Sequence, residues 1–382
     1  PLQYDLRFGY SGQPSIQDTA GLVRGYGVGQ EFTNLPIPTD QVTVPLDGDA
    51  FTRVLLNIPF GYGDITLGRF PVHLGTGLNS LCASSEVPYF DGVRLATRGS
   101  FLKTSHVGAV ISSREAGKGD VSDSSFPSNY DFGETTIVYV LHYAEAFLGK
   151  ARIGIGGQSM VAAPNNSVDF QNYLPLVPWV SANSPYTNTQ LIGDVTFAPA
   201  PWLELYLQGG VQSPPDGWGI LGLHGAVIGG GKVVVVSPDG VSTVQLEAGW
   251  TSSKWGSYSD EYALSRFIQR VGTGQNSTGM AISSPYGPGV IWGSGILGFQ
   301  SNKGFAADFI FEIMGKNTSV DLISGSYAAT GASYELFSIV SLNFEYAWDN
   351  QLSVQLRPSV GQYPQGFVPS VSLTVRFDVD YL

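Results

Sequence analysis

The segment VSLTVRFDVDY, residues 371–381, alternates apolar and polar residues without a break. In an extended strand successive side chains point to opposite faces, so one face carries Val, Leu, Phe and Tyr and the other carries Ser, Thr, Arg and Asp. A helix would mix the two kinds of residue around its circumference. The segment is therefore predicted to be a β-strand with one apolar face and one polar face.

The same period of two recurs from one end of the chain to the other. Near the N-terminus, Tyr4, Leu6 and Phe8 oppose Asp5 and Arg7. Further segments with this alternation are 53–60, 134–143, 203–208, 243–250, 305–313 and 352–357. The chain is therefore predicted to be all-β, and its first and last strands are expected to close one sheet.

The composition favours a sheet that lies in lipid. Only 13% of residues are charged, whereas a typical soluble domain has about 25%, and the chain holds 49 glycines. No run of eighteen apolar residues is present, so no membrane helix is predicted. A barrel wall with apolar residues on its outward face alone averages to near-neutral hydropathy. A soluble all-β protein remains the alternative.

Charge and cysteine content exclude several kinds of partner and cofactor. The net charge is −12 and no basic stripe is present, so no nucleic-acid partner is expected. Cys82 is the only cysteine, so neither an intramolecular disulfide nor a four-cysteine metal site can form. We expect no cofactor.

Short and long connections alternate between the predicted strands, as periplasmic turns and outer loops do in a membrane barrel. The longer connections fall near 11–49, 76–88, 113–131, 162–189, 253–287 and 317–333. About sixteen strands remain between them if 219–236 is one long strand; a turn at 229–231 would change the count. We predict one domain over 1–382, a transmembrane antiparallel up-and-down β-barrel.

Aromatic residues gather where the alternation stops, which is typical of the two aromatic girdles of a barrel. Those beside short turns are Phe60, Tyr62, Phe147, Trp202 and Trp348. Those beside long loops are Tyr10, Tyr89, Trp250, Trp255, Tyr286 and Tyr363.

In strand pattern, strand number and loop asymmetry, the whole chain resembles the bacterial outer-membrane porin class. The last segment is similar to the C-terminal signal that the barrel-assembly machinery recognises, although the chain ends in Leu382 rather than in an aromatic residue. The residues of this candidate signal are Val375, Phe377, Val379 and Tyr381. The resemblance implies a Gram-negative outer-membrane location, contact with outer-membrane lipids, passage of small polar solutes and, often, homotrimers.

In the porin class the third outer loop folds into the barrel and faces a basic wall, which makes a constriction. By counting, that loop is 113–131 here, with acidic residues Glu115, Asp120, Asp123 and Asp131. Candidate inward-facing basic residues are Arg53, Arg69, Arg94, Arg98 and Arg152. Alternatively, the acidic loop is solvated outside, the arginines pair with carboxylates in the wall, and 11–49 or 253–287 fills the lumen.

No constellation predicts an enzyme. The histidines His73, His106, His142 and His224 lie on different expected strands and lack metal-ligand spacing. The match of 293–298 to G-x-G-x-x-G falls in a predicted strand rather than before a helix.

We predict an outer-membrane channel for passive diffusion of small polar solutes or ions, narrowed by inward-folded loops. One alternative is a plugged structural or partner-docking barrel, as part of a surface layer or complex. Another is a soluble secreted β-protein that binds carbohydrate through Trp and Tyr.

Overall fold

The computed structural model describes residues 2–11, 53–83, 87, 89–111, 136–163, 187–212, 224–256, 267–271, 278–284, 286–317, 320, 334–348, 352–363 and 366–379. The elements of this part of the chain are β-strands. No helix within it is long and apolar enough to cross a membrane.

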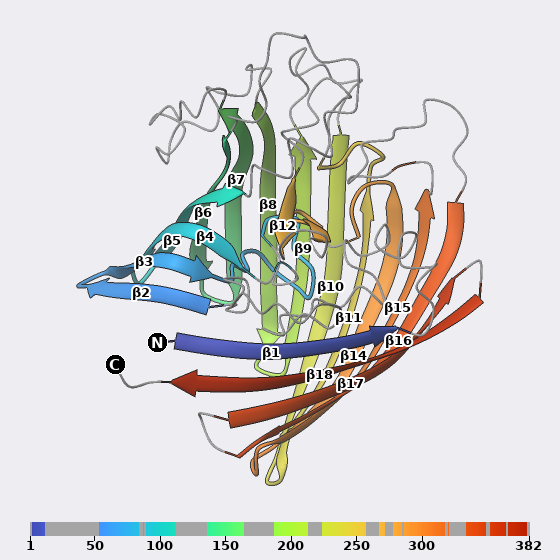
Figure 1. Ribbon diagram of the computed structural model, residues 1–382. Coiled ribbons are helices and arrows are strands. Elements are labelled where there is room, and N and C mark those ends of the chain that lie inside the picture. Colours follow the sequence, from blue (N-terminus) through green and yellow to red (C-terminus); the bar gives the residue numbers. More distant parts are fainter. Residues whose placement is uncertain are drawn as a thin grey trace, which may run out of the picture.

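Sixteen of the described strands form one closed antiparallel barrel, in which strands that follow one another along the wall are paired (Figure 1). The first eight are β1 (Leu2–Ser11), β2 (Arg53–Phe60), β3 (Gly63–Phe70), β4 (Phe90–Arg98), β5 (Leu102–Ile111), β6 (Thr136–Leu148), β7 (Ala151–Ala163) and β8 (Thr187–Ala200). The others are β9 (Leu203–Gln212), β10 (His224–Ser237), β11 (Gly240–Thr251), β14 (Val290–Ser301), β15 (Phe305–Asn317), β16 (Tyr334–Ala347), β17 (Leu352–Tyr363) and β18 (Gly366–Val379). A separate hairpin joins β12 (Ile268–Val271) and β13 (Thr278–Ala281).

The topology confirms the predicted up-and-down barrel. Residues 229–231 lie inside β10 and pair on both sides, so they form no turn. The first and last strands are neighbours, with β1 and β18 paired from Leu2 and Val379 to Ser11 and Ser370. β1 meets β2 at only two residue pairs, Leu2 with Val54 and Gln3 with Arg53, so this junction is the shortest in the wall.

Most exposed apolar side chains of the wall lie on its outward face, whereas the inward face combines buried polar side chains with apolar ones such as Leu141, Ile192 and Trp292. Leu205, Leu246 and Leu297 point outward and are each about half exposed, but Gln208 and Glu247 on the opposite face are buried. A closed sheet leaves no unpaired edge in lipid, and an apolar outer band meets the hydrocarbon directly. This arrangement is that of a membrane-spanning barrel, as predicted, and it contradicts the alternative of a soluble β-protein.

Exposed aromatic side chains mark the end of the barrel that carries the short turns. Phe60, Tyr62, Phe147, Trp202 and Trp348 are all exposed there. The register pairs Phe147 with Arg152 and so places it on the lumen face, outside the predicted girdle. We therefore place the short turns at the periplasmic boundary of the membrane.

The aromatic prediction is wrong for three residues at the opposite end. Trp250 is exposed, but Tyr89, Trp255 and Tyr286 are buried. Trp255 and Tyr286 belong to a connection that turns into the barrel, where they pack against the lumen wall. The side chains of Tyr10 and Tyr363 lie outside the described residues.

Candidate functional site

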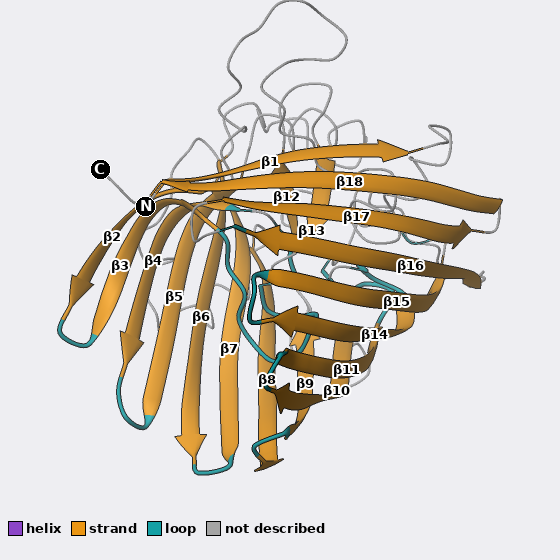
Figure 2. Ribbon diagram, turned by 90° about the horizontal axis from the view of Figure 1, so that it is seen from below, coloured by secondary structure: helices purple, strands orange, loops and turns teal. Residues whose placement is uncertain are grey.

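Within the described residues, parts of two long connections fold into the barrel, and Figure 2 shows loop segments inside the ring of strands. The first, here called the β3–β4 segment, is residues 71–89; the second, the β11–β14 segment, is residues 252–289 and includes the β12–β13 hairpin. Both bury apolar side chains in a common core with the wall. Fully buried examples are Leu81, Cys82, Val87, Trp255, Phe267, Ile282 and Tyr286.

The tip of the β3–β4 segment contacts a single carboxylate on β11. Glu247 accepts hydrogen bonds from the backbone amides of Leu78 (2.9 Å) and Asn79 (3.2 Å) and from Asn79 Nδ2 (2.7 Å). Tyr206 on β9 donates a fourth bond from its hydroxyl, at 2.9 Å. These contacts carry the segment across the lumen from β3 to β11.

Two glycines allow this close approach. Gly75 and Gly77 have φ of 102° and 92°, in the left-handed region that favours glycine. A Cβ at Gly75 would overlap the Gln208 amide, and one at Gly77 would overlap the Glu247 carboxylate. The pair Gly75 and Gly77 therefore lets the backbone lie directly against the wall.

Amide side chains hold the next part of the β3–β4 segment. Leu81 donates from its backbone N–H to Gln208 Oε1 (2.7 Å) and accepts from Gln158 Nε2 (2.8 Å). Gln158 also bonds to Gln190, and Gln190 donates to Gln212, so a row of amides runs across β7, β8 and β9. All four glutamines have no exposed surface.

The same row reaches the β11–β14 segment, because Gln212 Oε1 accepts a bond from the Gly256 amide at 2.7 Å. Farther along, the Tyr286 hydroxyl donates to Glu312 on β15 (2.7 Å). The two segments also bond to each other, from the Ser284 amide to the Ser80 carbonyl (3.0 Å). They therefore form one hydrogen-bonded layer in the lumen.

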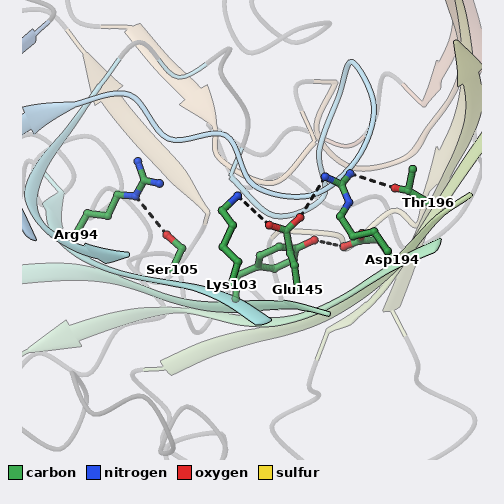
Figure 3. Close-up of polar contacts among 8 residues, drawn as sticks. Arg94, Lys103, Ser105, Glu145, Asp194 and Thr196 are labelled. Atoms are coloured by element: carbon green, nitrogen blue, oxygen red, sulfur yellow. Dashed lines mark hydrogen bonds and ion pairs between the residues drawn. The ribbon is translucent and has the colours of Figure 1, made fainter. Parts of the chain in front are cut away.

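Charged side chains lie on the lumen wall closer to the periplasmic turns. Lys103 on β5 and Arg152 on β7 both form ion pairs with the buried carboxylate of Glu145 on β6, at 2.9 and 3.3 Å. Both cations keep about a third of their side chains exposed. Figure 3 shows Lys103 and Glu145 on neighbouring strands, with side chains that meet on the same side of the sheet.

Three further hydrogen bonds complete this charged region. Arg94 on β4 donates to Ser105 (3.3 Å), and Arg152 donates to Thr196 on β8 (3.1 Å). Asp194 accepts a short hydrogen bond from Tyr143. The described lumen-facing side chains of β4 to β8 thus include four cations, Arg94, Arg98, Lys103 and Arg152, and two carboxylates, Glu145 and Asp194.

The predicted basic residues divide between the two faces. Arg94 and Arg152 face the lumen, and the register also gives Arg98 this face, at the periplasmic end of β4. Arg69 lies on the outward face, opposite Asp91, so its assignment to a lumen constriction is wrong. It forms an ion pair with Asp91 (2.8 Å) and lies over the Tyr89 ring.

For several residues of the predicted sites, the described part of the structure gives no side-chain contact. Arg53 begins β2, but its side chain is not described. The acidic residues Glu115, Asp120, Asp123 and Asp131 lie outside the described residues, so their role in a constriction stays a prediction. In the candidate assembly signal, Val375, Phe377 and Val379 lie in β18, and Tyr381 falls outside the described part.

His106 and His142 lie on different strands, as predicted, but β5 and β6 are neighbours and the two Nδ1 atoms are 2.9 Å apart. Among the described residues, no group of three or more His, Cys, Asp or Glu side chains could hold a metal ion.

No protein-family model matches the chain, and no curated protein sequence matches it. Wzi of Escherichia coli, an outer-membrane protein involved in group 1 capsule assembly and a carbohydrate-binding β-barrel, has 11% identity and a TM-score of 0.56, over 85% of this chain and 70% of that chain. OccAB4 of Acinetobacter baumannii has 9% identity and a TM-score of 0.45, over 85% of this chain and 73% of that chain. A BenF-like porin of Pseudomonas fluorescens has 11% identity and a TM-score of 0.44, over 85% of this chain and 76% of that chain.

At such identity the likeness to Wzi concerns the fold alone. Together with the closed sheet, the exposed apolar band and the aromatic girdle, it makes this protein a bacterial outer-membrane β-barrel. The resemblance to the porin class is thus confirmed at the level of architecture.

Proposed function

We propose that the protein is a narrow outer-membrane channel for small polar solutes, constricted by the β3–β4 and β11–β14 segments. The observation that carries this proposal is the hydrogen-bonded layer that these two segments form inside a polar lumen. An unobstructed barrel of sixteen strands has a wide aqueous channel. Because two segments here cross the lumen from opposite sides, the solutes that pass must be much smaller.

We further propose that the channel prefers anions, because the wall of β4 to β8 has more cations than carboxylates. On the rest of the lumen wall, the carboxylates Glu247 and Glu312 are buried and bonded to the inward segments. Lys103 and Arg152 share one carboxylate and remain partly exposed, so each can attract an anion that enters the periplasmic half of the lumen. Rings and walls of charged side chains set ion selectivity in this way.

Reversal potentials across a planar bilayer under a salt gradient test this proposal. The wild-type protein is expected to show anion preference, and the variant Lys103→Gln with Arg152→Gln is expected to lose most of it. Lys303→Gln, which removes a positive charge from an exposed turn, is the matched control and should change little. Cation preference in the wild type would contradict the selectivity proposal.

A second candidate function is a closed barrel that docks a partner. The observation that favours it is the complete burial of the residues that join the segments to the wall, Gln158, Gln190, Gln208 and Gln212. A silent bilayer despite verified insertion would favour this closed barrel over the channel.

A further inference from the structure

The β3–β4 segment is not held equally along its length. Its tip, at Leu78 and Asn79, bonds to the Glu247 carboxylate, whereas Leu81 bonds to two neutral amides, Gln158 and Gln208. Hydrogen bonds to an ionised acceptor are about twice as strong as neutral ones. The strongest polar attachment of the segment is therefore at its tip.

The surroundings of Glu247 suit a carboxylate and no neutral replacement. An ionised carboxylate only accepts hydrogen bonds, and Glu247 accepts from four donors: two backbone amides, the Asn79 side-chain amide and the Tyr206 hydroxyl. A glutamine of the same shape would direct an NH₂ group at donors on one side. Those buried donors would then lack an acceptor, which is costly.

We propose that Glu247 is a latch that fixes the β3–β4 segment across the lumen, and that removal of its charge lets the segment leave the wall. The segment is thus a movable part of the constriction rather than a fixed part of the barrel. The β-strands do not depend on this contact. In the wall, Glu247 pairs with Gly230 on β10 and with Ser294 on β14, and both pairings are made by the backbone. The latch stands without the channel function, but its effect on transport rests on that proposal.

Cys82 provides a built-in probe of the position of the segment. It lies three residues beyond Asn79, is fully buried, and is the only cysteine of the chain. Burial also raises the pKa of its thiol well above the ordinary value, so the reactive thiolate is scarce at neutral pH. A maleimide should therefore label Cys82 slowly while the segment is in place.

The test is the rate of maleimide labelling of Cys82 in the folded, detergent-solubilised protein. Glu247→Gln is expected to label at least tenfold faster than the wild type. Glu312→Gln is the matched control, because Glu312 is an equally buried lumen carboxylate that bonds to the other segment, at Tyr286. Its labelling rate should remain close to that of the wild type.

A second variant acts from the segment rather than from the wall. Gly77→Ala places a methyl group against the Glu247 carboxylate at a φ that disfavours alanine, and it leaves every barrel strand unchanged. It should also speed labelling at least tenfold. Heat-modifiable mobility in gels verifies that each variant retains a folded barrel.

Wild-type labelling rates in both Glu247→Gln and Gly77→Ala would overturn the latch, as would equal acceleration in Glu312→Gln. Bilayer conductance of the same variants is a separate measurement. Fast labelling of the Glu247→Gln and Gly77→Ala variants with silent bilayers would support the latch and count against the channel. Slow labelling of these variants with measurable conductance would support the channel and count against the latch.

Discussion

Buried amide side chains join the lumen wall to both inward segments. Gln190 occupies the middle of the row, since it accepts from Gln158 (2.6 Å) and donates to Gln212 (3.1 Å). Each flanking glutamine in turn bonds to one of the segments. A change at Gln190 therefore affects both segments at once.

Gln190→Leu is expected to lower the free energy of unfolding by about 1–3 kcal/mol, because it leaves buried polar atoms of two neighbours with fewer partners. Unfolding in urea, followed by tryptophan fluorescence in detergent, measures this change. Gln300→Leu is the control, since Gln300 is exposed and a surface change of this kind costs within about 0.5 kcal/mol. Equal losses in the two variants would contradict the role of the amide row.

At the level of single residues, the alternation predicted which faces are polar but not which polar residues meet. The prediction for Arg69 failed because its place in the alternation of its own strand was not counted. Ile65 and Leu67 face outward, and Arg69, two residues beyond Leu67, shares their face at the outer end of β3. A long cationic side chain at the end of an apolar face can reach the membrane interface. Glu247 fell on a correctly predicted polar face, but its bond to Asn79 joins residues far apart in the chain.

Strands could be predicted better than loops because their pattern is local. The period of two in 243–250 fixes both faces of β11 from the sequence alone. The path of a loop instead depends on partners distributed over several strands. The sequence indicated 253–287 as one of two segments that could fill the lumen, and its described residues do fold inward. It did not single out 76–88, whose described residues also fold inward.

The two faces of β11 provide a direct test of the barrel wall. Leu246→Arg puts a charge on the lipid face near the middle of the strand and is expected to cost about 2–4 kcal/mol. Gln245→Arg, one residue away, puts the same charge on the lumen side and should cost much less. Urea unfolding of the protein folded into lipid vesicles measures both, and similar costs would contradict the assigned faces.

As a whole, the molecule combines a sixteen-stranded wall with an interior that two of its own connections occupy. A wall of this size is sufficient for a wide pore, so under the proposed channel function the inward segments determine what can pass. The overall barrel and its approximate strand number could be predicted from strand periodicity and loop lengths. The position of the constriction could not, because it depends on how the 71–89 and 252–289 segments pack against each other and against the wall.

Single-channel conductance in a planar bilayer tests the central claim most directly, for the wild type and for a variant in which residues 73–87 are replaced by a short Gly-Ser linker. We predict small, steady conductance steps for the wild type and steps several times larger for the variant, because the linker no longer crosses the lumen. Equal conductance for the two proteins, or no conductance from either despite verified insertion, would contradict a channel constricted by the β3–β4 segment.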